Sequence, residues 1–408
     1  MINRAIHSLL KSRHFWRYAT FSEVAELYAA RLLRIFALHM ISLFIAVYLY
    51  NQGYSLVFIF GYLACYYFAK VPLSFLAGWL VAWRGPKHTI LYANIIYIPA
   101  LIAFSFVPEA GASHALVTIC IFALFQATSA TLYDYAHLVN FSKVKSVNHA
   151  GKELSYMQTV EKVASVISPV IGGVIATTFG ATTVMIIAAS LFAVAALPLL
   201  STDEPTKTRQ KIRWSGFPWR TTRKSVIAET GVGFDVVTSS VVWSLFLASV
   251  VFASQHNEVY AIIGILSAIG MVVALMSALV FGKIIDRKAG QLLLQYGVIG
   301  KSLSHIVRPL VGDGVGAALT NAGAEVSTTA YSMSFTRGMF DVADYSGFRF
   351  TYLLLIEIAA NVGAALACLI AMMLMHTIEE KYAFMMFFAI ASVYVLVLAT
   401  PRFSLYKR

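Results

Sequence analysis

Long apolar runs recur along the whole chain, from Leu27 to the C-terminal region. Each run is about 20 residues long, enough for an α-helix to cross the ~30 Å hydrocarbon core of a bilayer. Hydrophobic residues make up 59% of the chain and charged residues 12%, about half the charged share of soluble proteins. The twelve runs lie near 27–50, 55–82, 88–107, 115–138, 155–178, 181–200, 226–253, 259–283, 290–310, 315–336, 349–375 and 382–400. The sequence therefore predicts an all-α polytopic membrane protein with twelve transmembrane helices.

The second half of the chain repeats features of the first half in the same order. Val24-Ala25-Glu26 opens one apolar stretch, and Ile227-Ala228-Glu229 opens another 203 positions later. Gly78 has a counterpart in Gly282, 204 positions later. Because many solute transporters are built from internal repeats, we expect two six-helix bundles. The expected boundaries are an N-terminal segment at 1–24, a six-helix bundle at 25–200, a linker at 201–225, a second bundle at 226–400 and a tail at 401–408.

Positive charges are distributed unevenly between the two sides of this topology. With both termini in the cytoplasm, 24 of the 31 Lys and Arg residues lie in cytoplasmic segments, and the outer loops hold only Lys381. This asymmetry follows the positive-inside rule. It predicts a multi-pass protein of the cell (inner or plasma) membrane with both termini cytoplasmic. It also accounts for the net charge of +12 without a nucleic-acid partner, because no basic soluble domain is present.

Two segments are too polar to span the membrane. Residues 1–23 have the pattern of a basic amphipathic helix, and residues 201–225 mix seven basic residues with aromatic ones. Both patterns are typical of cytoplasmic segments that contact lipid headgroups, with a regulatory role as the alternative. Cys65, Cys120 and Cys368 fall inside spans and are expected to be small buried apolar residues, without a disulfide or metal pattern.

A motif of Gly, Asp, Arg and basic residues lies between the second and third spans of a half. In the second half it reads Gly282-Lys283-Ile284-Ile285-Asp286-Arg287-Lys288-Ala289-Gly290. In the first half Gly78, Arg84, Gly85 and Lys87 are present, but Ala82 and Trp83 replace the Asp and the Arg. The fifth span carries Ser168-Pro169-Val170-Ile171-Gly172-Gly173. These motifs, with six spans on either side of a basic join, resemble the major facilitator superfamily over residues 25–400. The resemblance is to a prokaryotic secondary transporter and assigns no subfamily.

The resemblance implies a cavity and a gate. In this family spans 1, 4, 7 and 10 line a central cavity, and the two halves rock around it. The motif cluster holds the inner side shut and breaks as the halves rock. The gating residues implied here are Gly282, Asp286, Arg287, Gly78 and Arg84. A plain positive-inside loop with one counter-ion is the alternative.

Ionisable residues inside the spans are the candidates for function. Each costs at least about 2.5 kcal/mol at the bilayer centre unless it is paired or hydrated. Glu325 lies about 11 residues from either end of the tenth span, too deep for its side chain to reach water at the membrane surface. We predict that Glu325 binds the coupling proton, with Asp235 on the seventh span and Glu357 on the eleventh as further proton sites.

The residues predicted to bind substrate lie on three spans. They are Arg31, Arg34 and His39 on the first span, Lys70 on the second and Asp235 on the seventh. Arg31 and Arg34 are three positions apart and share one helix face. An interfacial anchor is the alternative for Arg31, and a hydrogen-bonded core residue is the alternative for His39.

Two further groups of charged residues receive structural interpretations. On the ninth span Lys301, His305 and Arg308 form a basic stripe. Arg308 is expected to anchor at the outer interface, while Lys301 needs a partner that the sequence does not identify. Asp134 and His137 lie one turn apart on the fourth span. With only two ligands nearby, a local hydrogen bond is favoured over a metal site.

The candidate cations lie mainly in the first half and the candidate carboxylates in the second. A site between the halves would suit a zwitterion such as an amino acid or short peptide, unless these charges pair with each other. We therefore predict a secondary active transporter that moves a small polar or zwitterionic solute by alternating access, coupled to protons. An amphiphile, lipid or drug translocase on the same fold is the alternative. No enzyme is expected, because no zinc-protease or nucleophile-elbow motif is present. The expected partners are the solute, a proton and membrane lipids, for a monomer without cofactor or metal.

Overall fold

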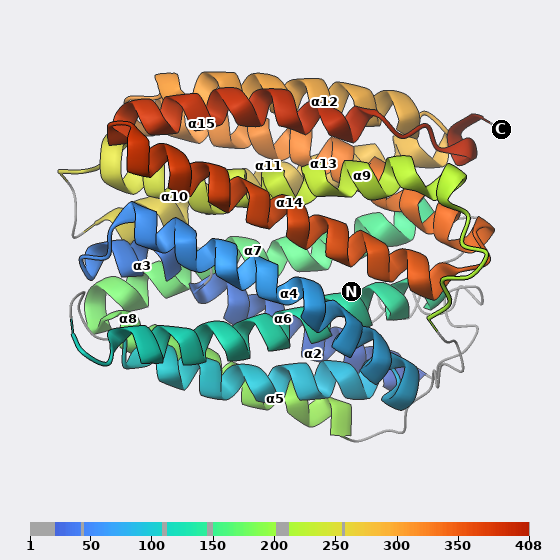
Figure 1. Cartoon of the computed structure of the whole chain (residues 1–408), viewed down its shortest axis with the longest axis horizontal. Coiled ribbons are helices and arrows are strands. Elements are labelled where there is room, and N and C mark those ends of the chain that lie inside the picture. Colours follow the sequence, from blue (N-terminus) through green and yellow to red (C-terminus); the bar gives the residue numbers. More distant parts are fainter. Residues whose placement is uncertain are drawn as a thin grey trace, which may run out of the picture.

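The computed structural model describes residues 21–41, 45–107, 112–144, 150–200, 212–254 and 258–407. Residues 1–20, which make up most of the expected surface helix of the N-terminal segment, and residues 201–211 of the linker lie outside these ranges. Among the described residues all regular structure is helical. The helices run side by side along the long axis of the molecule (Figure 1).

The first half contributes six spans. They are α2 (Phe21–Ile41) with α3 (Ile45–Asn51), α4 (Leu56–Arg84), α5 (Pro86–Ser105), α6 (Ala115–Val144), α7 (Ala150–Phe179) and α8 (Ala181–Ala196) with a 3-10 turn (Leu197–Leu200). Short links are set by local chemistry. Gly85, at φ 92°, joins α4 to α5, which begins at Pro86. A positive φ suits glycine, and proline is favoured in the first helical turn.

The second half also contributes six spans. They are α9 (Trp219–Val237) continued by a π-helical turn (Thr238–Val242), α10 (Trp243–Phe246) and a second π-helical turn (Leu247–Val251); α11 (Val259–Asp286); α12 (Gly290–Val307) with a 3-10 turn (Arg308–Leu310); α13 (Gly314–Tyr345); α14 (Arg349–Thr377); and α15 (Glu380–Tyr394) with a 3-10 turn (Val395–Ala399). A last 3-10 turn covers Ser404–Lys407.

The predicted polytopic all-α fold is thus confirmed. Of the described helical segments, nine are long and apolar enough to cross a membrane by length and composition alone. The α12 and α13 spans do not meet that test, and they carry Lys301, His305 and Glu325. Lys301 and His305 are buried and Glu325 is half-buried, so the lower hydropathy of these spans coincides with polar side chains inside the bundle.

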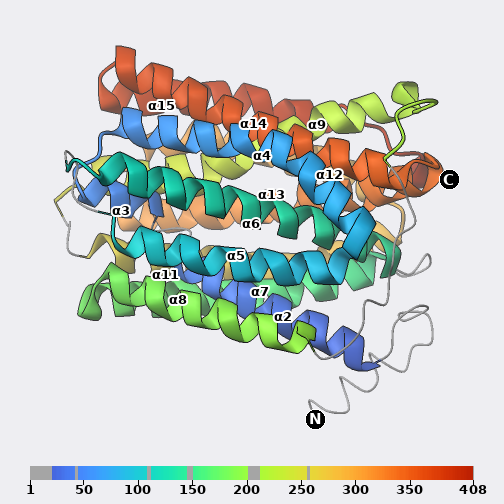
Figure 2. The ribbon, with the colours of Figure 1, turned by 60° about the horizontal axis from the view of Figure 1, so that its bottom comes forward.

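Two helix pairs join the halves. The α4 helix packs along α14, and α7 packs along α11. These are the second and eleventh spans, and the fifth and eighth. The predicted duplication, if it relates the two halves by a twofold exchange, would relate one pair to the other. Figure 2 shows that α2, α9 and the C-terminal segment share one end of the molecule, where α2 and α9 begin.

Glycines permit close approach of α7 to two neighbours, α2 of the same half and α11 of the other half. A Cβ added at Gly172 would lie 2.5 Å from the Met40 carbonyl oxygen of α2. A Cβ added at Gly264 of α11 would lie 3.0 Å from the Pro169 carbonyl oxygen of α7. A larger residue at either place would push the helices apart.

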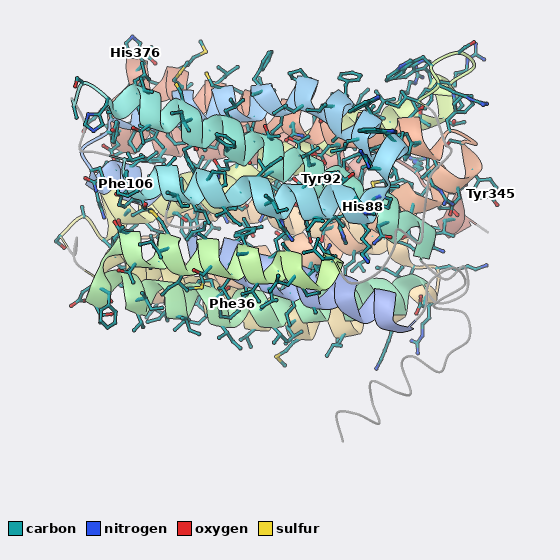
Figure 3. All side chains as sticks on the ribbon, turned by 90° about the horizontal axis from the view of Figure 1, so that it is seen from below. Phe36, His88, Tyr92, Phe106, Tyr345 and His376 are labelled. Carbon is teal, nitrogen blue, oxygen red and sulfur yellow. The ribbon has the colours of Figure 1, made fainter. Side chains whose placement is uncertain are left out.

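Apolar side chains project outward around the helix bundle (Figure 3). Phe106 and Tyr345, 71% and 63% exposed, lie toward opposite ends. Such a surface suits a lipid environment. The expectation that all three cysteines are buried is wrong, because Cys65 and Cys120 are exposed and only Cys368 is buried. They lie on helix faces that point away from the core, which the span assignment alone could not show.

Candidate functional site

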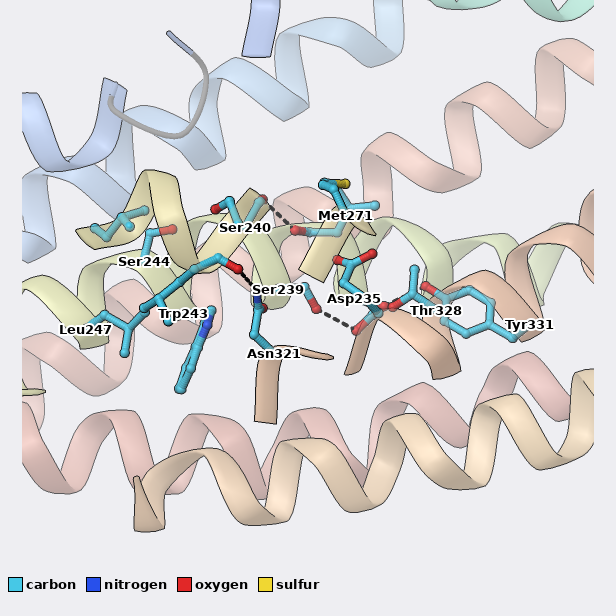
Figure 4. Close-up of a pocket in the computed structure, with 15 residues that line it drawn as sticks. Asp235, Ser239, Ser240, Trp243, Ser244, Leu247, Met271, Asn321, Thr328 and Tyr331 are labelled. Carbon is cyan, nitrogen blue, oxygen red and sulfur yellow. Dashed lines mark hydrogen bonds between the residues drawn. The ribbon is translucent and has the colours of Figure 1, made fainter. Parts of the chain in front are cut away.

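A cavity of about 260 Å³ lies in the second half of the chain (Figure 4). The seventh span, α11 and α13 supply its walls. Its polar lining consists of Asp235, Ser239, Ser240, Ser244, Ser267, Asn321, Glu325, Thr328 and Tyr331. Its apolar lining consists of Val236, Trp243, Leu247, Ile263, Leu266 and Met271. Two carboxyl groups, an amide and several hydroxyls thus meet an apolar wall in one small space.

The seventh span is not a regular α-helix where it lines the cavity. Its backbone is π-helical from Thr238 to Val242, and the Trp243 N–H donates to the carbonyl oxygen of Thr238, five residues earlier. A π-turn holds an extra residue and changes the direction of the side chains that follow, and such turns are frequent at functional sites. Here Ser239, Ser240 and Trp243 face the cavity.

Asp235 is buried and is the first residue of the seventh span that lines the cavity. Four neighbours hold its carboxylate. Its Oδ1 accepts a hydrogen bond from Ser239 at 3.1 Å and lies 2.8 Å from His305 Nε2. Its Oδ2 accepts a hydrogen bond from the Tyr331 hydroxyl at 2.5 Å and lies 3.5 Å from Lys301 Nζ. A buried charge is best tolerated when it is both paired and hydrogen-bonded. This network meets both conditions.

Arg308 extends the network to the π-helical turn. Its Nη1 lies 3.3 Å from the Thr238 carbonyl oxygen and 3.3 Å from His305 Nδ1, and its guanidinium carbon is 5.0 Å from the centre of the Trp243 ring. Arginine can only donate, so His305 Nδ1 accepts and its Nε2 proton is donated to Asp235. The network therefore combines two cations, one carboxylate and a neutral histidine.

Glu325 lines the cavity from α13, opposite Gly270 of α11. A Cβ added at Gly270 would lie 3.0 Å from Glu325 Cγ and 2.7 Å from Asn321 Nδ2. Asn321 is fixed by a hydrogen bond of 2.8 Å to the Leu266 carbonyl oxygen. Glycine at position 270 lets α11 approach α13 closely enough for both polar side chains to fit beside it.

A second charged cluster lies at the join of the halves, where α4, α6 and α14 meet. Lys70 Nζ is 3.0 Å from Asp134 Oδ2 and 3.7 Å from Glu357 Oε1. Asn361 donates a hydrogen bond of 2.8 Å to the same Glu357 oxygen. The side chains of Lys70 and Glu357 are buried, whereas that of Asp134 is 43% exposed. The pairing of intramembrane charges that the sequence left open as an alternative is therefore present in this cluster.

Arg34 lies inside the first half, not at the cavity. Its Nη1 donates to Asn94 Oδ1 at 2.6 Å and its Nη2 to Ser129 Oγ at 3.3 Å. Its guanidinium carbon lies 3.9 Å from the centre of the Tyr133 ring. Among the residues that the structure describes, no carboxylate lies within ion-pair distance of Arg34. Neutral dipoles and an aromatic face therefore surround this fully buried cation.

The other predicted residues of spans one and four also lie outside the cavity. Arg31 contacts the His137 ring of α6, and His39 is half-buried on α2. Asp134 pairs with Lys70, so the predicted hydrogen bond between Asp134 and His137 is wrong. Sequence spacing placed the two side chains on one helix face, but partners on neighbouring helices lie closer.

The residues that the sequence predicts to form a gate lie at the end of the molecule where α2 and α9 begin. Gly78 and Gly282 are buried near the ends of α4 and α11, whereas Arg84, Asp286 and Arg287 are exposed at the turns that follow. A Cβ added at Gly78 would lie 3.7 Å from Leu354 of α14. The first-half glycine thus sits at the join of the halves.

The sequence interpretation of the ninth span was wrong in one respect. Arg308 is 1% exposed and is not an anchor at the outer interface. Lys301 and His305 are also fully buried, and both contact Asp235. The signal was present in the spacing, because residues four and three positions apart share one helix face. A basic stripe on a buried face requires a carboxylate, and Asp235 is that partner.

Known proteins place this architecture in a family. The Major Facilitator Superfamily sequence profile matches residues 27–340. The crystal structure of the nucleoside transporter NupG matches with a TM-score of 0.64 at 14% identity, over 93% of this chain and 98% of that one. A bacterial homologue of the iron transporter ferroportin, in an outward-facing state with soaked iron, matches with a TM-score of 0.68 at 12% identity, over the same shares. No curated protein sequence matches the chain.

The profile covers well over half of the chain, and the solved structures share its fold along nearly their whole length. Twelve described helical segments, with α4 against α14 and α7 against α11, agree with that assignment. The chain is a multi-pass membrane protein and belongs to the Major Facilitator Superfamily of secondary transporters.

Proposed function

We propose that this transporter binds a small polar solute in the cavity of its second half and moves it by alternating access, driven by protons. The observation that carries the proposal is the cavity itself. Glu325 and Asp235 lie in its lining, together with Asn321, Trp243 and the serines of the seventh span. A few polar groups that converge on a partly apolar pocket are the usual form of a small-molecule site.

The size and lining of the cavity restrict the solute. Its volume of about 260 Å³ is below the ~300–1,000 Å³ of pockets for drug-sized ligands. Ser239, Ser240 and Asn321 offer hydrogen bonds to hydroxyl or amino groups. Trp243 offers a flat apolar face. These features favour a compact polar solute over a lipid or a bulky drug.

We further propose that Glu325 receives the positively charged group of the solute. For a zwitterion, we propose that the anionic group meets Lys70, which lies outside the cavity lining and has a partly exposed partner in Asp134. Lys70 is held by two carboxylates, so an incoming anion must exchange with one of them. Arg34 already donates to two neutral partners, and we propose only a supporting role for it.

Glu325 is also the proposed coupling site. Asp235 already has four stabilising neighbours, so protonation there would break an established network. Glu325 lies at the cavity wall within electrostatic range of Lys301 and Arg308. A carboxyl group that meets both the solute and the proton can link their movements.

The test begins with thermal-shift screening of purified protein against amino acids, peptides, nucleosides, sugars, drugs and lysolipids. A stabilising solute is then used in proteoliposomes. Glu325→Gln should abolish uptake driven by a pH gradient, whereas exchange of solute, which needs no net proton movement, should persist with weaker solute affinity, because Glu325 also meets the solute. The matched control is Glu258→Gln, the same change at an exposed position. Full gradient-driven uptake by Glu325→Gln would reject the coupling role, and stabilisation by lysolipids alone would favour the translocase alternative.

A further inference from the structure

Two hydroxyl groups of the seventh span already donate their protons to the protein. Ser239 and Ser240 both line the cavity (Figure 4). Ser239 donates to Asp235 Oδ1 at 3.1 Å and accepts from Arg308 Nη1 at 3.3 Å. Ser240 donates to the Val236 carbonyl oxygen at 2.6 Å. A hydroxyl group has one proton and two lone pairs, so both serines can only accept a hydrogen bond from a solute.

The hydroxyl groups that α13 contributes to the cavity are committed in the same way. Tyr331 donates to Asp235 Oδ2 at 2.5 Å. Thr328 donates to the Ala324 carbonyl oxygen at 2.9 Å and accepts from Lys301 Nζ at 2.7 Å. Chemistry fixes these directions, because carbonyl and carboxylate oxygens only accept and an ammonium group only donates. Both side chains therefore present lone pairs to a solute.

The other polar groups of the lining include both acceptors and donors. Glu325 adds a carboxylate. Asn321 donates one N–H to the Leu266 carbonyl oxygen at 2.8 Å, which leaves its own carbonyl oxygen and one N–H for a solute. Ser244 and Ser267 have no hydrogen bond to another described residue, so they keep their protons. Acceptors thus outnumber donors in the lining.

An acceptor-rich cavity with a carboxylate favours one kind of group on the solute. A primary ammonium brings three N–H donors and a positive charge on a single atom, whereas a hydroxyl brings one donor and two more acceptors. The ammonium group can therefore meet Glu325 and the lone pairs of Ser240 or Thr328 together, without leaving an acceptor of its own unpaired.

A cation without N–H groups finds little in this cavity to bind it. Quaternary ammonium ligands are recognised by cages of aromatic faces. Only Trp243 and Tyr331 are aromatic among the lining residues. The Arg308 guanidinium carbon already lies 5.0 Å from the centre of the Trp243 ring, so this face is partly engaged by a cation. Hydrogen-bond acceptors, and not an aromatic cage, dominate the site.

We propose that the cavity selects a solute with a primary ammonium group and rejects the same solute once that nitrogen is fully methylated. Methylation keeps the positive charge but removes every N–H donor. The acceptors of the wall then lose water without gaining a partner, and a site built for hydrogen bonding discriminates strongly against an analogue that lacks them. The proposal rests on the proposed function, because it names the class of solute for the same cavity.

Isothermal titration of the purified full-length protein at neutral pH tests this selectivity. The probes are ethanolamine and choline, its N-trimethyl form, which share the positive charge and the hydroxyl group. A third probe is ethanolamine methylated twice on carbon, which adds bulk and keeps every N–H. We expect choline to bind at least about tenfold more weakly than ethanolamine, and the carbon-methylated probe to bind within about threefold of it. Glycine and trimethylglycine give the same comparison for a zwitterion.

A substitution at Ser240 separates hydrogen bonding from packing. Ser240→Ala removes one acceptor without changing the charge of the cavity. It should weaken ethanolamine binding about tenfold and leave choline binding unchanged, because choline has no N–H for that oxygen. The matched control is Ser277→Ala on α11. Ser277 donates to the Val273 carbonyl oxygen at 2.8 Å, as Ser240 does to Val236, but it lies outside the lining. This control should change neither affinity.

Equal affinity for ethanolamine and choline, or equal weakening of both by Ser240→Ala, overturns the proposal. Tighter binding of choline to Ser240→Ala than to the native protein also overturns it, because size would then decide. If every ammonium probe fails to bind while another solute alters Trp243 emission, the primary-ammonium class is rejected and the cavity remains the solute site. A transported solute that leaves Trp243 emission unchanged rejects the cavity itself, and so the proposed function.

Discussion

Asp235→Asn is the substitution for which the structure sets the clearest magnitude. It keeps the shape of the side chain but removes the negative charge 3.5 Å from Lys301 Nζ. At an effective dielectric constant of about 20, that attraction is about 5 kcal/mol. Breaking one partner of a buried pair typically costs about 3–5 kcal/mol. The amide nitrogen also places a donor against one of the two donors that now contact the carboxylate, Tyr331 or His305. We therefore expect the free energy of unfolding to fall by about 3–5 kcal/mol.

The assay is denaturant-induced unfolding of purified protein in one detergent. Asp344→Asn is the matched control, because the Asp344–Arg349 pair lies at the surface, with side chains 35% and 29% exposed. Exposed pairs contribute about 0–1 kcal/mol, so this control should change stability little. The double variant Asp235→Asn/Lys301→Met removes both buried charges and should recover much of the loss. A loss below about 1 kcal/mol for Asp235→Asn, or a double variant no more stable than the single one, would refute the reasoning.

Three further substitutions test other contacts. Gly270→Val places methyl groups against the polar wall of the cavity and should weaken solute binding about tenfold or more, or ~1.4 kcal/mol. The control Gly323→Ala has open space around it and should leave binding unchanged. Isothermal titration of the solute measures both affinities. Gly233→Ala puts a Cβ 1.8 Å from a carbonyl oxygen and should destabilise the protein by about 3 kcal/mol or more in thermal unfolding, while unchanged stability would contradict the α9–α14 crossing. Burial raises the pKa of the Tyr406 phenol, so its stabilising effect is present below about pH 10 and is lost as pH rises further. Tyr406→Phe should lessen that alkaline loss of stability, and an identical pH profile would contradict the burial of this group.

The fold could be predicted from sequence because the bilayer imposes it. An apolar run long enough to cross the membrane must be helical, since backbone groups find no water there. The duplicated pattern around Gly78 and Gly282 then predicted two halves of similar structure. Helix ends were less predictable. The tenth span was expected at 315–336, but α13 extends to Tyr345, because polar residues continue the helix beyond the apolar run.

The site could be predicted only in part, because sequence shows which charges are buried but not which charges meet. Asp235 and Glu325 were identified from their depth in the spans, and both line the cavity. Arg34 was identified by the same reasoning, yet it packs against Asn94 and Tyr133 within the first half. The π-helical turn at Thr238–Val242 has no sequence signature that we can name. It changes which faces of the seventh span reach the cavity.

Solute binding in the cavity is tested most directly by the fluorescence of Trp243, which lines it. The other five tryptophans of the chain are replaced by phenylalanine, and emission is titrated with the transported solute. We expect Trp243 emission to change saturably with solute, with the same affinity as thermal shift measures. Asn321→Ala should weaken that affinity about tenfold or more, which corresponds to a loss of ~1.4 kcal/mol or more of binding free energy. A solute that is transported but leaves Trp243 emission unchanged at saturation, or binds Asn321→Ala equally well, would contradict binding in this cavity.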